Sequence, residues 1–128
     1  MSFSGYHHVG LSVKDAQKSV DFYTKGLGGK VTFSFPMSDS GKTIYLVDLG
    51  GNAVIEIIPR GEGKEEENAH WAHIAVRTDN AKAAYDAAIK AGAVNRTEPK
   101  EVQLGTMPAC IAFVLGPDKE VIEFFQVK

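Results

Sequence analysis

Two histidines and two glutamates occupy matching places in the sequence. His8 begins the apolar stretch HVGLSV and His73 begins the similar stretch HIAV, while Glu56 interrupts VIEII and Glu123 interrupts VIEFF. Burying a carboxylate among aliphatic side chains costs several kcal/mol unless it is paired, protonated or bound to a cation. Two imidazoles with two carboxylates can bind a divalent metal ion, neutralise its charge and leave positions open for water or substrate oxygens.

Each of these residues also has a simpler explanation. A lone histidine on a strand is more often a structural residue, and a lone glutamate in an apolar run often faces solvent. The metal site is favoured because the histidine on a strand and the glutamate in an apolar run both recur at matching places in the second half of the sequence. Strand alternation turns His7 away from His8, so we expect His7 at the periphery. The same holds for His70, three residues before His73, unless a bulge at Trp71 shifts the strand.

The four residues belong to two copies of one unit. The stretch HVGLSVKDAQKSVDFYTKG aligns without a gap with HIAVRTDNAKAAYDAAIKA. In each copy a strand of alternating polarity leads to a helix, and three strands follow, so the order βαβββ occurs twice. After the helices, we expect strands at about 31–35, 42–49 and 52–59 in the first copy, and at about 94–102, 107–115 and 120–127 in the second.

Capping and stop signals mark the helix of each copy. Asp15 is the expected N-cap of the first helix, and Asp79 or Asn80 is that of the second. Glycines end both helices, at Gly28-Gly29 and before Gly92. Spacings of three and four predict the buried residues, which are Ala16, Val20, Tyr23 and Leu27 in the first helix and Ala81, Ala84, Tyr85, Ala88 and Ile89 in the second.

Composition bounds the domain organisation and the partners. The 128 residues, 44% of them hydrophobic, fit one domain with modules at about 5–60 and 70–127 and a polar linker at about 60–69. A formal charge of −2 argues against nucleic-acid binding, and no apolar run reaches the roughly 20 residues of a membrane span. Without a secretory signal and with one cysteine, Cys110, which we expect in the core, the protein is expected in the cytoplasm.

The chain resembles the glyoxalase I branch of the vicinal oxygen chelate superfamily. The resemblance covers nearly all residues and is carried by HHVGLSVKDAQKSVDFYTKGLGGKV, AVIEII, AHIAVRTDN, IAFVLGPD and VIEFF. It implies an α+β glyoxalase/bleomycin resistance fold, in which two βαβββ modules form curved mixed sheets around a cavity. It also implies a homodimer, since sites of that family are often assembled from one module of each subunit; whether the site of this chain forms within one chain or across a dimer stays open. By position, the metal ligands of that family fall on His8, Glu56, His73 and Glu123.

The activity that the resemblance implies is a lyase reaction on a 2-oxoaldehyde and a thiol. The hemithioacetal of methylglyoxal and a thiol such as glutathione is isomerised, through an enediolate, to an S-lactoyl thioester. A metal ion would stabilise the enediolate while a carboxylate moves a proton between adjacent carbons. Glu123 is the expected proton carrier, with Glu56 mainly a ligand or the partner base. Nickel or cobalt suits an octahedral site of nitrogen and oxygen ligands, and zinc stays open.

The substrate contacts are less clearly marked. Glutathione-using members of that family have an arginine after the leucine of the first strand, where this chain has Ser12. Arg77 and Arg60 are the alternative residues for a substrate carboxylate. The remaining candidates for substrate contact are Trp71 and Met107.

Two other functions stay open. One is an epimerase that acts beside a thioester carbonyl and needs the same metal and proton transfer. The other is a non-catalytic protein that binds a small molecule in the same fold. Epimerases of this superfamily resemble a pattern with glutamine in place of Glu56, so Glu56 favours the glyoxalase I pattern.

Overall fold

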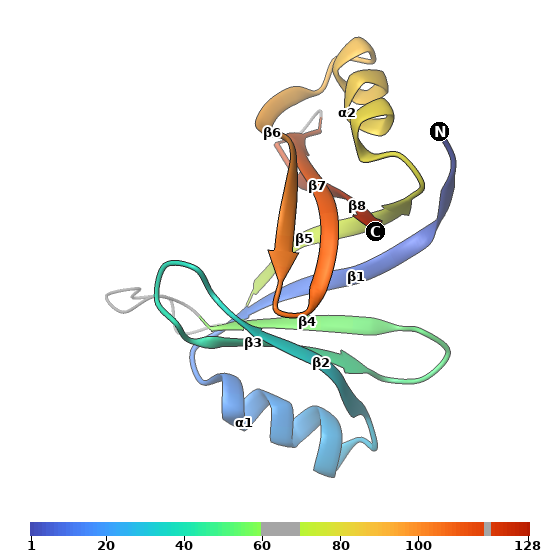
Figure 1. Ribbon diagram of the computed structural model, residues 1–128. Helices are drawn as coiled ribbons and strands as arrows, with labels where there is room; N and C mark the ends of the chain where they lie inside the picture. The colour runs from blue at the N-terminus through green and yellow to red at the C-terminus, as the bar shows by residue number, and fades with distance from the viewer. Residues whose placement is uncertain (60–69, 117–118) are drawn as a thin grey trace. The chain divides into compact units, whose positions relative to one another are not determined.

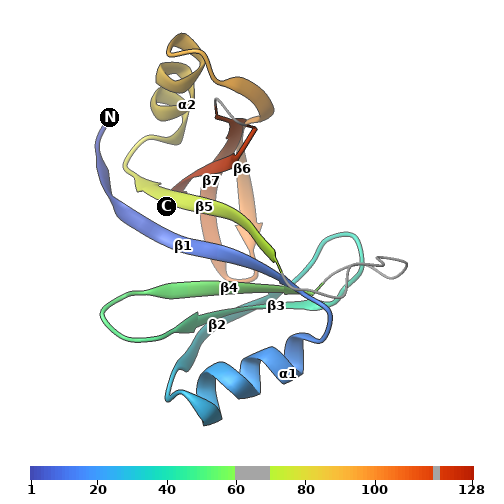
Figure 2. The same ribbon diagram turned by 180° about the vertical axis from the view of Figure 1, so that it is seen from behind.

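The computed structural model describes residues 1–59, 70–116 and 119–128 and shows two compact units (Figure 1, Figure 2). We call His8–Ala72 the N-terminal unit, and Met1–His7 together with His73–Lys128 the C-terminal unit. The order βαβββ occurs twice along the chain, which confirms the predicted α+β class of two βαβββ modules. The predicted linker at about 60–69 lies outside the described residues.

The first module contains four strands and one helical segment. Its elements are β1 (Phe3–Val13), α1 (Ala16–Asp21), the π-helical turn η1 (Phe22–Gly26), β2 (Lys30–Pro36), β3 (Thr43–Asp48) and β4 (Val54–Pro59). The strand order is β2-β3-β4-β1, in which β1 and β4 run parallel and the other neighbours run antiparallel. The predicted turn after β3 is present, because the Leu49 amide donates to the Ala53 carbonyl.

The second module repeats this plan. Its elements are β5 (His70–Thr78), α2 (Ala81–Lys90), β6 (Val94–Leu104), β7 (Met107–Leu115) and β8 (Val121–Val127). The order is β5-β8-β7-β6, again with the first and last strands of the module parallel and the others antiparallel. In both modules the strands after the helix start and end within one or two residues of the predicted bounds.

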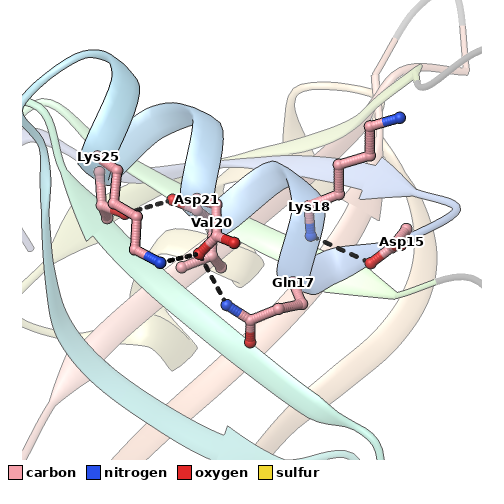
Figure 3. Close-up of polar contacts among 7 residues, drawn as sticks. Asp15, Gln17, Lys18, Val20, Asp21 and Lys25 are labelled. Atoms are coloured by element: carbon pink, nitrogen blue, oxygen red, sulfur yellow. Dashed lines mark hydrogen bonds and ion pairs between the residues drawn. The ribbon is translucent and has the colours of Figure 1, made fainter.

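The start of helix α1 follows from its capping residue. The Asp15 carboxylate accepts a hydrogen bond from the Lys18 amide at 3.1 Å, as predicted for an N-cap (Figure 3). On the exposed side, Asp21 accepts from Gln17 at 2.9 Å and lies 3.6 Å from the Lys25 ammonium (Figure 3). Exposed pairs of this kind contribute well under about 1 kcal/mol, so packing rather than charge holds the helix in place.

The buried side of this helix packs on strands β3 and β4. Val20 is buried in a cluster with Val47 and Ile57, as the spacing predicts. Leu27 was predicted on the same side but is 61% exposed, so that prediction is wrong. The helix continues beyond Asp21 as the π-helical η1, and its wider turn changes which residues share a face. The other predicted residues, Ala16 and Tyr23, are partly buried against the cluster.

Helix α2 is capped by Asn80, whose side chain accepts from the Ala83 amide at 3.0 Å. Ala81 and Ala84 are buried against strands β7 and β8, as predicted. Ile89 is 37% exposed, which contradicts the prediction, because it lies in the last turn at the edge of the apolar stripe. Of the described helices, none has the length and apolar content to cross a bilayer.

The first residues of the chain pack in the C-terminal unit. The Ser2 amide and hydroxyl donate to the two oxygens of the Asp79 carboxylate, at 2.8 and 3.0 Å. These hydrogen bonds lower the pKa of Asp79, and they explain why Asp79 is not the helix cap. The Phe3 ring stacks on Phe124, with 6.1 Å between ring centroids. Residues 1–7 are therefore an integral part of this unit.

Cys110 is buried beside helix α2, as predicted for a packing residue. Burial raises the pKa of its thiol. Because of this raised pKa, the folded protein holds the thiol proton more tightly than the unfolded chain does. The resulting contribution to the free energy of unfolding is complete at pH values below the unfolded pKa of about 8.5, and it is lost as the pH rises through the folded pKa.

We expect a disulfide reagent at pH 8 to modify Cys110 at least about tenfold faster in guanidinium than in buffer. Equal rates would show that the thiol is exposed in the folded protein.

Candidate metal centre

The N-terminal unit holds the first histidine and glutamate pair. In the pairing of β1 with β4, Gly10 lies opposite Glu56. His8 is two positions before Gly10, so its side chain is on the same side of the sheet as Glu56. Both side chains are buried, and the His8 Nε2 lies 3.6 Å from the Glu56 Oε1. This distance is longer than the roughly 2.7–2.9 Å of a charge-assisted hydrogen bond.

The C-terminal unit holds the second pair in the same register. Ala75 lies opposite Glu123 where β5 pairs with β8, and His73 is two positions before Ala75. The His73 Nε2 lies 3.2 Å from the Glu123 Oε1, and Glu123 is only 4% exposed. The duplication seen in the sequence is thus a duplication of strand pairing, which gives each module one imidazole beside one carboxylate.

The sides of strand β5 agree with the predicted alternation. Val76 packs against the cluster beneath helix α2. Ala75 belongs to a separate buried cluster with Ile111 and Phe125. His73 is in phase with Ala75 and is therefore on the side of the sheet away from the helix. The apolar surroundings keep water from screening the Glu123 carboxylate, so a nearby cation would stabilise its ionised form strongly.

A metal ion fits the donor chemistry of both pairs. Imidazole nitrogen and carboxylate oxygen bind such ions at about 2.0–2.2 Å, which puts neighbouring ligand atoms about 3.0 to 3.5 Å apart. The separations of 3.6 Å and 3.2 Å are close to this range. His8, Glu56 and His73 offer ligand atoms of the kinds that hold metal ions. Each pair can therefore supply two neighbouring ligands.

The neighbouring His7 does not lie at the periphery, which corrects our expectation. Its ring is buried and stacks on Phe125 with 4.0 Å between ring centroids. Strand alternation does turn His7 away from His8, but towards the interior of the C-terminal unit rather than towards solvent. Packing on Phe125 accounts for its burial. His70 begins strand β5, and its side chain lies outside the described part of the structure.

The predicted substrate contacts differ in their surroundings. Ser12 is buried in β1, whereas Trp71 is 60% exposed at the start of β5. Arg77 is half-buried in β5, and Met107 is half-buried at the start of β7, where it packs on an apolar cluster. Arg60 lies outside the described residues.

The surroundings of His73 include two residues that the sequence does not mark. The Phe113 ring meets the His73 ring edge-on, with 5.9 Å between centroids and 77° between planes. The guanidinium carbon of Arg96 lies 5.8 Å from the centroid of the same Phe113 ring. No local motif signals this arrangement, because it depends on how strands β6 and β7 pair.

Comparisons with known proteins give one family and several relatives. The model of the Glyoxalase/Bleomycin resistance protein/Dioxygenase superfamily matches residues 5–124. A lactoylglutathione lyase from Escherichia coli is 35% identical over 125 residues, which cover 94% of this chain and 91% of that protein. A probable lactoylglutathione lyase from Vibrio cholerae is 33% identical over 125 residues, covering 94% and 89%. The solved structure of methylmalonyl-CoA epimerase from Mycobacterium tuberculosis shares the fold, with a TM-score of 0.76, 22% identity and coverage of 97% and 88%.

Proposed function

Because this chain belongs to the glyoxalase/bleomycin resistance protein/dioxygenase superfamily, we propose that it is a metal-dependent lyase of the glyoxalase I type. The proposed substrate is the hemithioacetal of methylglyoxal and a thiol, and the product is an S-lactoyl thioester. The observation that carries the proposal is the repeated buried pair, His8 with Glu56 and His73 with Glu123. The lactoylglutathione lyases among its relatives support glutathione as the thiol.

The proposed metal site uses both pairs. We propose that His8, Glu56, His73 and Glu123 bind one divalent ion, with the two pairs contributed by one chain or by the two chains of a homodimer. Two imidazoles and two carboxylates favour nickel or cobalt, with zinc as the alternative. When bound, the ion would polarise the two adjacent oxygens of the substrate and make the neighbouring C–H bond more acidic.

The residues of the chain then carry the proton. In the proposed reaction, Glu123 takes the proton from the carbon that bears the sulfur and returns it to the adjacent carbon. The substrate gains and loses no atoms or electrons overall, since this is an isomerisation. Burial of Glu123 supports this role, because a carboxylate shielded from water can hold the abstracted proton until it is returned. Glu56 acts mainly as a ligand, or as the base on the other side.

The test is a direct assay of thioester formation. The protein is stripped of metal, loaded with nickel, cobalt or zinc, and mixed with methylglyoxal and glutathione while ultraviolet absorbance is followed. We expect thioester to form with loaded protein and not with stripped protein. Protein that is loaded but inert with several thiols would contradict the lyase proposal.

An epimerase is the second candidate, favoured by the fold shared with methylmalonyl-CoA epimerase. It needs the same proton transfer beside a thioester carbonyl. Exchange of the α-hydrogen of methylmalonyl-CoA with solvent deuterium, in protein that is inert as a lyase, would assign this activity instead.

A further inference from the structure

Strand β6 contains a β-bulge at Arg96. Asn95 lies opposite Val114 on strand β7. Thr97 lies opposite Phe113, which directly precedes Val114 in β7. Two steps along β6 therefore match one step along the antiparallel β7, and Arg96 has no partner of its own in the ladder. An extra residue of this kind leaves the regular alternation, and its side chain is aimed where a regular strand would not send it. Bulges are frequent beside functional sites for this reason.

The guanidinium of Arg96, at the bulge, lies over the Phe113 ring, which in turn contacts His73 of the pair His73 and Glu123. Its carbon lies 5.8 Å from the Phe113 centroid, within the range of a cation–π contact. The same ring meets His73, which lies 3.2 Å from Glu123. Two ring contacts and the contact between His73 and Glu123 therefore connect Arg96 to the candidate proton carrier, and all four residues belong to the C-terminal unit.

The hydrogen-bonding groups of this guanidinium remain available to a ligand. No hydrogen bond or ion pair joins Arg96 to another residue within the described ranges, and the residue is exposed. Contact with an aromatic ring fixes an arginine side chain while leaving N–H donors for a carboxylate or phosphate. A lysine would give one point charge, whereas arginine offers two parallel hydrogen bonds.

We propose that Arg96 is a specificity-determining residue that binds a carboxylate of the substrate. This inference rests on the proposed function for the identity of the reaction, but the anion site itself does not depend on it. The carboxylate can belong to the thiol, as in glutathione, or to the acyl part, as in methylmalonyl-CoA.

The first test compares thiols with and without a carboxylate. Metal-loaded wild type, Arg96→Gln and Arg96→Lys are assayed with methylglyoxal and either glutathione or 2-mercaptoethanol. For Arg96→Gln with glutathione, we expect kcat/KM to fall about 10- to 100-fold, mainly through KM. With 2-mercaptoethanol we expect less than about a twofold change, and Arg96→Lys should recover part of the loss.

The matched control is Lys90→Gln, which removes one positive charge from the exposed end of helix α2. It should leave the ratio of the two thiol activities unchanged, because Lys90 lies in neither pair nor beside Phe113. An equal fall of kcat/KM for both thiols in Arg96→Gln would mean a purely structural role and would overturn the inference. An unchanged kcat/KM for glutathione would overturn it as well.

A binding experiment separates this inference from the proposed function. Calorimetry measures S-methylglutathione and methylmalonyl-CoA binding to loaded wild type and Arg96→Gln. Weaker binding of S-methylglutathione in the variant assigns the carboxylate to the thiol, and weaker binding of methylmalonyl-CoA alone assigns it to the acyl part. Either result in a protein without lyase activity would keep the anion site and reject the lyase. Lyase activity with binding that does not depend on Arg96 would keep the lyase and reject the anion site.

Discussion

Replacing Glu123 with glutamine is expected to lower kcat by about a hundredfold to ten-thousandfold in metal-loaded protein, because glutamine cannot accept and return a proton. Glutamine has nearly the same shape, so the buried site should keep its packing. The Glu123 carboxylate lies beside His73 in the proposed site, and the loss should therefore appear in kcat more than in KM. Rates of thioester formation at saturating hemithioacetal measure it.

The chain contains its own matched control for this variant. Glu56 has the equivalent register position in the first module and the same kind of histidine partner. If Glu56 is mainly a ligand, Glu56→Gln should reduce kcat less than Glu123→Gln at saturating metal. Circular dichroism of both variants checks that each is folded. A Glu123→Gln protein with kcat within tenfold of wild type would remove Glu123 as the proton carrier.

Removing either histidine of the proposed site is expected to weaken metal binding by at least about 100-fold. Because the four residues are proposed to share one ion, His8→Ala and His73→Ala should both lower the bound metal, although they lie in different modules. When the free metal concentration is a hundred times the dissociation constant, metal binding raises the free energy of unfolding by about 2.7 kcal/mol. The rise in Tm on adding nickel should therefore shrink in both variants, in parallel with the metal content measured by elemental analysis.

His7 supplies the control for this experiment. It is a buried histidine directly before His8, but its ring packs on Phe125. His7→Phe keeps an aromatic ring there and should retain the metal content of the wild type. Unchanged metal content in both His8→Ala and His73→Ala would rule out the proposed site. Loss in only one of them would mean that the two modules do not share an ion.

The repeat made most of the fold and of the candidate site predictable. Strand alternation and helix caps depend on neighbouring residues, so Asp15 and the strand bounds follow from local sequence. The pairing of each histidine with its glutamate follows because two copies of one unit share one register. Glu56 and Glu123 were recognisable because a charge in an apolar run is costly, and its recurrence at a matching place is informative.

The features that were not predicted depend on backbone hydrogen bonding or on contacts between distant residues, neither of which the spacing of apolar residues reveals. Leu27 is exposed because the helix changes to a π-helical turn, a change in hydrogen bonding that apolar spacing does not reveal. His7 is buried because a segment far along the chain supplies Phe125. Arg96 meets Phe113 because strand β6 has one residue more than its partner at that point. Strand register is fixed by tertiary packing, so such positions are visible only in the structure.

The attachment of the first residues to the C-terminal unit has a consequence for the order of events during synthesis. The hydrogen bond between Ser2 and Asp79 joins residues that are 77 positions apart in the sequence. Phe3 stacks on Phe124, so this contact cannot form before Phe124 has been synthesised. During synthesis, the segment His8–Ala72 emerges from the ribosome well before strands β6, β7 and β8, which complete the C-terminal unit. We therefore expect the N-terminal unit to gain its structure first, while residues 1–7 stay without their native neighbours until strand β8 has been synthesised.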